Sequence, residues 1–393
     1  MENLTVPMKR VLFVNPLLAS HGNLSQYNVQ MTRIGSLISD SFKSVVITGT
    51  LMLPQKTIRT VDGVPVIAVQ SAGIPFLKHM FYALGEWFMN FEDLIDTFQP
   101  DCLVCTEDFS LSTLQGIRYG KRKGIPTLVY SGLYLNAGFP FGLPHFAFSR
   151  TIGTRIYRDA SAVIAKTSSA AQFLEKAGCS TKKIQVIPPT INTSQFQSTE
   201  PPHWMASLRE SNKKLILFVG ELTSNKNPVA LIETLAKVRE TKDVVLLMIV
   251  TDGPKAAEVA KAIRKNNLRP YVKILKNVPL HDMPSFYSAA DVLMSLSGVE
   301  IFGMSILESL SCGTPVVSTP TAGPADMIVD GLNGYLAKDF TSEAIADALL
   351  MILDNESGEA MSSAEIRSSI EGRFDEHTVA GMWRCLLATV LDI

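Results

Sequence analysis

Short apolar runs alternate with longer segments of helical periodicity, and this alternation narrows the possible folds more than any other feature of the chain. In the first half we expect strands at residues 11–14, 45–47, 64–69, 102–105, 127–130, 162–164 and 184–187. Helical patterns lie between them, among them residues 29–38 and an aromatic-rich stretch at residues 76–96. Strands with few polar residues are buried on both faces, and intervening helices supply that cover. The pattern predicts a parallel sheet of the α/β class.

A second series of strands follows, at residues 215–219, 244–250, 272–275, 292–294 and 316–317. A proline-rich segment, from Ile187 to Pro202, separates the two series. The chain has 393 residues, more than one hydrophobic core usually serves. We therefore expect two Rossmann-like domains, at residues 1–190 and 213–373, joined by a linker at residues 191–212. A ligand would bind in a central cleft between them, at the carboxyl ends of the strands.

The segment after the strand at residues 292–294 carries two glutamates around a helix start. Gly303 lies in the turn, and a helical pattern occupies residues 304–311. Glu300 stands just before this helix and Glu308 about one and a half turns inside it. N–H groups at a helix N-terminus bind anions, and carboxylates accept hydrogen bonds from sugar hydroxyls. The combination suits a nucleotide-sugar.

This block resembles the Glu-x7-Glu signature of retaining glycosyltransferases with the GT-B fold, above all glycosyltransferase family 4 (group 1). Two glutamates at this spacing are by themselves more typical of a solvated helix face, but other motifs of the family surround them in the family's order. They are Val219-Gly-Glu-Leu-Thr-Ser-Asn-Lys226-Asn-Pro, Val250-Thr-Asp-Gly253-Pro, Val278 to Met283, Tyr287-Ser-Ala-Ala-Asp291 and Gly331-Leu-Asn-Gly334. The resemblance covers nearly the whole chain. It implies a C-terminal helix, within residues 374–393, that crosses back onto the first domain.

The resemblance also implies roles for the matching residues. Glu300 matches the glutamate that contacts hydroxyls of the donor sugar, and Lys226 matches the lysine that neutralises the departing diphosphate, so these are the catalytic candidates. Glu308 matches the glutamate that binds the ribose hydroxyls. Further donor contacts are implied for Gly22 and for the backbone of Phe302, Gly303, Met304 and Ser305. The resemblance leaves the acceptor residues unknown.

Two positions depart from the family pattern. Glu221 stands where the family usually has a second cation, an arginine, for the diphosphate. A carboxylate there repels a pyrophosphate unless it turns away or pairs with Lys226. The family often has a histidine after the strand that here ends at Tyr130, whereas this chain has Ser-Gly-Leu. His145 is a possible substitute for the histidine, and the candidates to replace the arginine are Arg150, Arg155 and Arg158.

Cofactor motifs are absent from the sequence. No tight Gly-x-Gly-x-x-Gly follows Val14, which disfavours NAD or FAD. No Asp-x-Asp triplet occurs, and metal-dependent glycosyltransferases of the other main fold generally hold their cation with one. Cys102 and Cys105 lie in an expected strand without a second pair to complete a zinc site, so we expect them in the core. We expect no metal and no cofactor.

The charges are unevenly divided along the chain. Residues 1–190 hold 18 Lys+Arg and 12 Asp+Glu, a balance of +6, which leaves 36 − 18 = 18 against 37 − 12 = 25 in the remainder, a balance of −7. A basic first half can face anionic lipid or a phosphorylated acceptor, or it can be a chance asymmetry of the surface. No basic run with interleaved aromatics is long enough for a nucleic-acid interface.

Residues 124–149 contain no charged side chain, which raises the question of a membrane span. Several prolines and glycines argue against a continuous helix there. Followed by arginines, this aromatic stretch can rest at a lipid interface, form an acceptor cleft or pack inside the domain. The odd cysteine count of five and the short polar start favour a cytoplasmic location. Peripheral contact with the inner face of the membrane stays open.

We interpret the chain as a retaining, metal-independent glycosyltransferase of hexosyltransferase type. It would move a sugar from a UDP- or GDP-linked donor to a hydroxyl of a glycan, lipid or small-molecule acceptor. The alternative is a non-catalytic relative that binds a nucleotide or glycan, or supports a partner enzyme, and Glu221 is the feature in its favour. A GT-B epimerase shares the fold but usually lacks the Glu-Ile-Phe-Gly type of block.

Overall fold

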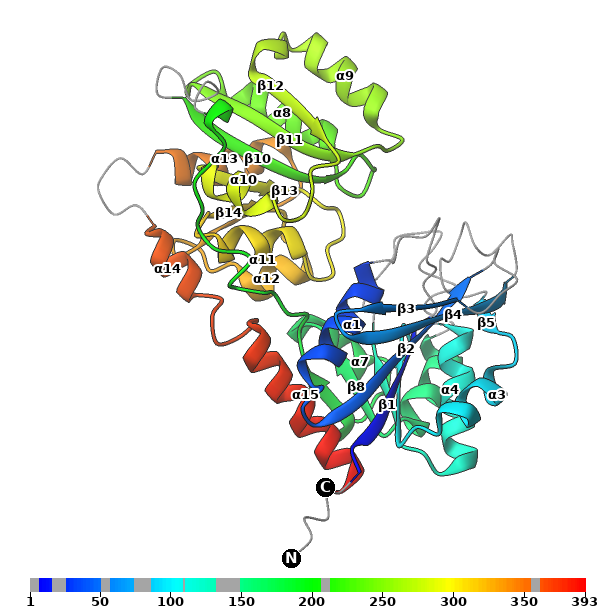
Figure 1. Ribbon diagram of the computed structural model, residues 1–393. Coiled ribbons are helices and arrows are strands. Elements are labelled where there is room, and N and C mark those ends of the chain that lie inside the picture. Colours follow the sequence, from blue (N-terminus) through cyan, green and yellow to red (C-terminus); the bar gives the residue numbers. More distant parts are fainter. Residues whose placement is uncertain are drawn as a thin grey trace, which may run out of the picture. The chain divides into compact units, whose positions relative to one another are not determined.

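The computed structural model describes residues 7–15, 26–50, 57–73, 86–108, 110–131, 149–205, 213–354 and 361–393. The chain forms two compact units (Figure 1). Unit 1 comprises Met1–Thr190 together with Glu376–Ile393, and unit 2 comprises Ile191–Asp375. Each unit is built around its own sheet, as the two series of apolar runs predict.

Unit 1 contains a sheet of nine strands among the described residues, in the order β3-β4-β2-β1-β6-β7-β8-β9, with β5 paired to β4. The strands are β1 (Lys9–Asn15), β2 (Phe42–Thr50), β3 (Thr57–Val61), β4 (Val64–Gly73), β5 (Glu86–Phe88), β6 (Cys102–Thr106), β7 (Thr127–Tyr130), β8 (Ala162–Ala165) and β9 (Ile184–Val186). The helices are α1 (Gln26–Leu37), α3 (Phe91–Phe98), α4 (Leu111–Lys123), α6 (Thr154–Asp159), α7 (Ser168–Lys176) and α15 (Glu376–Leu391).

Successive residues of β1 contribute to the two faces of this sheet. Val11 and Phe13 pack with residues of α1 and α15, whereas Leu12 and Val14 pack with residues of α3 and α4. Figure 1 shows these two helix pairs along opposite faces of the sheet. Because neighbouring side chains of a strand point to opposite faces, a strand covered on both sides has to be apolar throughout. All four residues are fully buried.

Helix α15 completes one face of unit 1. The indole of Trp383 is fully buried and lies against Phe13 and Tyr130, with ring centroids 6.1 and 5.9 Å away. The Arg33 Nε atom bonds a carboxylate oxygen of Glu376 at 2.5 Å. Helix α15 and strand β1 therefore share one hydrophobic core.

Within the described residues, the helix expected at residues 76–96 is found only in part. Residues 86–88 form β5, which pairs antiparallel with β4, and only the end of the expected segment lies in α3. Aromatic side chains such as those of Trp87 and Phe88 are as suited to a strand as to a buried helix face. The short antiparallel strand β3, which hydrogen-bonds to β4, was also not expected. The sheet is therefore parallel in its centre and antiparallel at this edge.

Unit 2 has the strand order β12-β11-β10-β13-β14-β15, parallel throughout its described pairings. This is the doubly wound order in which the strand sequence reverses next to the first strand. The strands are β10 (Lys214–Glu221), β11 (Val244–Thr251), β12 (Val272–Lys276), β13 (Val292–Ser295), β14 (Val316–Ser318) and β15 (Gly334–Leu336). The helices are α8 (Pro228–Val238), α9 (Ala256–Lys265), α10 (Met283–Ala289), α11 (Met304–Ser311), α12 (Ala322–Met327), α13 (Ser342–Leu353) and α14 (Ser363–Ser368).

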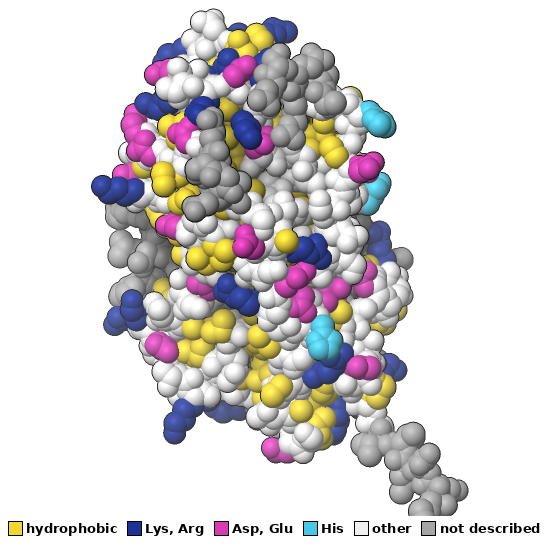
Figure 2. Space-filling model, turned by 90° about the vertical axis from the view of Figure 1, so that its left-hand side faces the viewer, with side chains coloured by type: hydrophobic (Ala, Val, Ile, Leu, Met, Phe, Trp, Pro, Cys, Tyr) yellow, Lys and Arg dark blue, Asp and Glu magenta, His cyan; other side chains and the backbone are white. Residues whose placement is uncertain are grey.

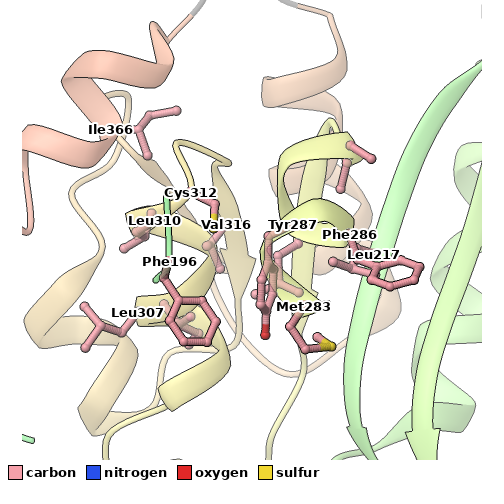
Figure 3. Packing of buried hydrophobic residues seen from close by; sticks show 14 of the residues in the cluster. Phe196, Leu217, Met283, Phe286, Tyr287, Leu307, Leu310, Cys312, Val316 and Ile366 are labelled. Atoms are coloured by element: carbon pink, nitrogen blue, oxygen red, sulfur yellow. The ribbon is translucent and has the colours of Figure 1, made fainter. Parts of the chain in front are cut away.

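The two faces of the unit 2 sheet again take alternate residues. Leu217 of β10 packs in the cluster that contains α10 and α11, and Phe218 packs in the cluster that contains α8, α9 and α13. Figure 3 shows the first cluster, in which the ring of Tyr287 lies among aliphatic side chains near Phe196. These two ring centroids are 6.4 Å apart. Helices α10 and α11 are thus fixed against the sheet by packing.

The first residues of unit 2, residues 191–205, pack against the core of that unit. Ile191, Phe196 and Met205 are buried in the same cluster as α11. The Ser311 Oγ atom donates to the carbonyl oxygen of Phe196 at 2.6 Å, and Arg367 donates to that carbonyl at 3.2 Å. Hydrogen bonds and burial therefore hold residues 191–205 in unit 2.

Charged side chains of both signs are interspersed on the face of the molecule that Figure 2 shows. None of the helices described here has the length and the apolar character that a membrane crossing requires.

Candidate functional site

The start of α11 is built around a backbone conformation that favours glycine. Gly303 has a φ of 93° and directly precedes the helix. A Cβ atom at this position would lie 3.0 Å from the Ile306 Cδ1 atom and 3.3 Å from the Glu300 Cγ atom. Glycine therefore permits both the positive φ and the close approach of the turn to the helix. Helix α11 begins at Met304 and ends at Ser311, as the sequence predicts.

Lys226 and Glu300 are brought together by this turn. The Lys226 Nζ atom lies 2.5 Å from a carboxylate oxygen of Glu300. The Ser297 Oγ atom donates to the same oxygen at 3.0 Å. The side chains of Lys226 and Glu300 are 27% and 14% exposed, so both are reachable by a ligand yet partly desolvated. A partly buried charge pair is screened less by solvent than a surface pair.

Asn225 holds the loop that carries Lys226 against the loop that carries Glu300. Its side-chain amide donates to the carbonyl oxygen of Val299 at 2.9 Å, and its side-chain oxygen accepts from the Val299 N–H at 2.9 Å. Its backbone carbonyl accepts from the Gly298 N–H at 2.7 Å. The ion pair therefore rests on a hydrogen-bonded scaffold, which our reading of the sequence did not identify.

Glu308 is oriented by a tyrosine from α10. The Tyr287 hydroxyl donates to a carboxylate oxygen of Glu308 at 2.7 Å. Burial of Tyr287, and then the nearby charge of Glu308, hold the pKa of the phenol well above its usual value. Tyr287 thus stays a donor throughout the physiological range. Tyr287 lies within a recognised motif, but nothing in the motif showed its contact with Glu308.

The remaining expected donor contacts lie at the start of α11. The ring of Phe302 is buried and packs against Phe374, with centroids 5.7 Å apart, so only the backbone of Phe302 can face a ligand. Met304 and Ser305 are partly buried in the first turn of the helix. The N-terminus of a helix carries partial positive charge and presents N–H groups to an anion. Gly22 and His145 lie outside the described residues.

Glu221 does not pair with Lys226. It ends β10 on the exposed surface, and within the described part of the chain its carboxylate has no hydrogen-bond or ion-pair partner. Its backbone carbonyl accepts from the Thr223 N–H at 2.8 Å. Of the arginines proposed as substitutes for the family's second cation, Arg158 pairs with Asp159 at 3.0 Å. Arg150 and Arg155 are exposed.

Cys102 and Cys105 are fully buried in β6. Burial raises the pKa of the Cys102 thiol to about 12, and that of Cys105 still further. Both are therefore neutral core residues. A group of buried ionisable side chains follows β6 and β8 in unit 1, namely Glu107, Asp108 and Lys166, and our reading of the sequence did not find it.

Residues 202–368 match the family model for glycosyl transferases group 1. Among curated proteins, a D-inositol 3-phosphate glycosyltransferase of Xylanimonas cellulosilytica is 29% identical over 230 residues, which cover 56% of this chain and 55% of that protein. The GPI3 subunit of the phosphatidylinositol N-acetylglucosaminyltransferase of Saccharomyces cerevisiae is 23% identical over 197 residues, which cover 50% and 43%. The chain spans about half the length of the curated relatives it matches.

Solved structures resemble the chain over nearly its full length. Anabaena Alr3699/HepE in complex with UDP has a TM-score of 0.76 at 20% identity, with 97% of this chain and all of that chain covered. Sucrose-phosphate synthase from Thermosynechococcus elongatus has a TM-score of 0.74 at 16% identity, with the same coverage. At these identities the likeness shows the fold. The expected fold, with two parallel-sheet α/β domains of the GT-B type, and the resemblance to group 1 glycosyltransferases are both confirmed.

Proposed function

We propose that this chain, whose residues 202–368 match the family model for glycosyl transferases group 1, is a retaining and metal-independent glycosyltransferase. It moves a sugar from a nucleoside-diphosphate donor, UDP- or GDP-linked, to a hydroxyl of a glycan, lipid or small-molecule acceptor. The observation that carries the proposal is the partly exposed Lys226–Glu300 pair beside the N-terminus of α11. This arrangement offers a cation and helix N–H groups to a phosphate, and a carboxylate to sugar hydroxyls.

Donor binding exchanges one partner of Lys226 for another. Before the donor binds, the ammonium is held by Glu300. A diphosphate carries more negative charge than one carboxylate and competes for the ammonium. Glu300 is then available to hydroxyls of the donor sugar. Charge grows on the diphosphate as the glycosidic bond breaks, so a fixed ammonium and the dipole of α11 stabilise the transition state more than the ground state.

Glu308 binds the ribose. A carboxylate has two oxygens that suit a vicinal diol, and Tyr287 holds one of them at 2.7 Å. Reported neighbours of the same fold were solved with UDP and with UDP-glucose, which supports a uridine donor.

Retention is expected to follow front-face attack. The bond between the anomeric carbon and the diphosphate oxygen breaks, and the acceptor oxygen bonds to that carbon on the same face. The acceptor proton passes to a diphosphate oxygen, so no side-chain base is required. In the proposed metal-independent reaction, Lys226 and the N-terminus of α11 neutralise the leaving diphosphate.

The alternative is a module that binds a nucleotide or glycan without turning it over, and the exposed carboxylate of Glu221 favours it. Calorimetry with UDP, GDP and their sugars, followed by an assay for donor hydrolysis, separates the two functions. Tight nucleotide binding with no hydrolysis and no transfer to any acceptor supports the binding module.

The test of the enzyme is kinetic. Lys226→Ala and Glu300→Gln should each lower kcat/KM for sugar transfer about tenfold or more, which corresponds to at least ~1.4 kcal/mol of transition-state stabilisation. Lys242→Ala is a matched control, because Lys242 has a similar exposure, 28%, and pairs with Asp354 instead. Transfer at the wild-type rate by both test variants would show that the assignment is wrong.

A further inference from the structure

Three ionisable side chains are buried together in unit 1, and the proposed donor chemistry does not use them. Glu107 and Asp108 directly follow β6, and Lys166 directly follows β8. Their exposed fractions are 3%, 1% and 4%. Buried charges destabilise a fold unless each finds a partner, so this cluster requires a specific explanation.

Glu107 and Lys166 form a pair within the cluster. The Lys166 Nζ atom lies 3.5 Å from a carboxylate oxygen of Glu107 and 4.9 Å from the ring centroid of Tyr130. The Glu107 backbone, with a φ of 64°, is in the left-handed region and donates its N–H to the carbonyl oxygen of Tyr130 at 3.0 Å. Lys166 is thus already committed to a carboxylate and an aromatic face.

Asp108 has one satisfied oxygen and one unsatisfied oxygen. Its Oδ2 atom accepts from the Ser131 hydroxyl at 2.9 Å and from the Tyr157 hydroxyl at 2.6 Å. Its Oδ1 atom is buried and has no hydrogen-bond partner among the described residues. An unpaired buried acceptor is unfavourable, because the water it has lost is not replaced. A ligand that donates an N–H or O–H to Oδ1 would remove this penalty.

The charges in the cluster also favour a ligand that donates an N–H or O–H group over an anionic one. The cluster contains two carboxylates, and in the described part of the chain Lys166 is the only cation paired with either of them. Burial raises the pKa of Asp108, although the Tyr157 and Ser131 hydroxyls oppose this. A bound phosphate would bring negative charge into a desolvated site that already disfavours it. A hydroxyl or an ammonium group adds none.

The cluster lies where open α/β sheets bind ligands. It follows the carboxyl ends of β6 and β8, and Ser131 directly follows β7, which lies between them in the sheet. We propose that Asp108, supported by Glu107 and Lys166, is an acceptor subsite that binds a hydroxyl or amino group and discriminates against phosphate. This inference rests on the proposed glycosyltransferase function and specifies its acceptor class. It sets the chain apart from its relatives named for D-inositol 3-phosphate.

The first arm of the test uses the wild-type full chain. Thermal stabilisation and sugar transfer from UDP-glucose are measured with matched probes, namely myo-inositol, D-inositol 3-phosphate, glucose, glucosamine and glucose 6-phosphate. The inference predicts that the unphosphorylated probes bind about tenfold or more tightly than their phosphorylated counterparts. Glucosamine against glucose distinguishes an ammonium from a hydroxyl. Tighter binding of the phosphorylated probes, or no binding by any probe, overturns the inference.

The second arm uses Asp108→Asn, which keeps the shape and leaves an oxygen for Ser131 and Tyr157 but places an amide donor where Oδ1 was. Binding of the preferred probe should weaken about tenfold, and the discrimination against phosphate should shrink. Asp101→Asn is the control, since Asp101 lies at the other end of β6, paired with Lys9. Unchanged probe binding by a folded Asp108→Asn variant counts against the subsite. If it does not fold, the wild-type comparison still decides.

The two proposals fail in different ways. If UDP-glucose is turned over but the acceptor is phosphorylated, the acceptor inference falls and the enzyme assignment stands. If none of the UDP- and GDP-linked sugars binds or reacts, the enzyme assignment falls. Thermal stabilisation by the sugar probes then still reports on the subsite.

Discussion

Lys226 and Glu300 are separated by 74 positions in the sequence, yet their charged groups are in contact. The resemblance to a known family identified both residues because each lies in a recognisable motif. Glu107, Asp108 and Lys166 could not be found in this way. Each follows an ordinary apolar strand, and only the sheet order places β6 near β8. A contact between side chains on different strands depends on the strand order, which a motif in the linear sequence does not show.

At the residue scale, Tyr287→Phe tests whether Glu308 must be held to bind the ribose. The substitution keeps the buried ring but removes the hydrogen bond at 2.7 Å. We expect the KM for the donor to rise about fivefold, in line with ~1 kcal/mol for one hydrogen bond. The effect should disappear with a donor that carries a 2′,3′-dideoxyribose. An equal effect on both donors would indicate that Tyr287 has only a packing role.

At the scale of elements, the periodicity of the sequence located most strands and the helix α11. Strand β7 and helix α11 have the predicted bounds. Strand β15 was not predicted, and its first residue shows the physical reason. Strand β15 begins at Gly334, where a Cβ atom would lie 2.1 Å from the carbonyl oxygen of Val316. The close approach of β15 to the backbone of β14 requires a glycine, and glycine does not contribute to the apolar pattern from which a strand is predicted.

Asp101 and Asp108 flank β6, and their contributions to the stability of the fold should change with pH in opposite directions. At Asp101, burial raises the pKa, but the Arg10 N–H and Lys9 lower it by more, so the net pKa is below its usual value. Its charged form stabilises the fold above the unfolded pKa, about 3.9, and that stabilisation is lost as pH falls. At Asp108, burial dominates and raises the pKa. Its contribution is therefore present below pH about 3.9 and is lost as pH rises.

Chemical denaturation from about pH 2 to about pH 7 checks this prediction, because the contribution of Asp101 is lost below pH about 3.9 and that of Asp108 above it. Relative to the wild type, Asp101→Asn should become less stable as pH rises, and Asp108→Asn should become more stable. The same trend for both variants would show that the two carboxyls share one environment.

At the scale of the whole molecule, the last helix belongs to the core of the first unit. The buried ring of Trp383 contacts Phe13 of β1, so strand β1 and helix α15 are stabilised together. Unit 2 has a separate core, in which the buried residues come from positions 191–374. Two cores in one chain predict two partly independent unfolding transitions. The proline-rich boundary made this division predictable, whereas the return of the helix was implied by the family resemblance.

Trp383→Ala should therefore destabilise unit 1 selectively. Loss of a buried tryptophan side chain costs about 3–5 kcal/mol. In differential scanning calorimetry we expect one transition to move to a lower temperature, and UDP to raise the temperature of the other. A uniform downward shift of a single transition that UDP also raises would show that the units unfold as one.

The central claim is that Lys226 and the start of α11 grip a diphosphate, and titration calorimetry with UDP and UMP tests it most directly. The Lys226→Ala variant should lose about tenfold in affinity for UDP and little for UMP, while Lys242→Ala should bind both nucleotides as the wild type does. If Lys226→Ala binds UDP with wild-type affinity, the ammonium does not contact the diphosphate and the proposed site is wrong.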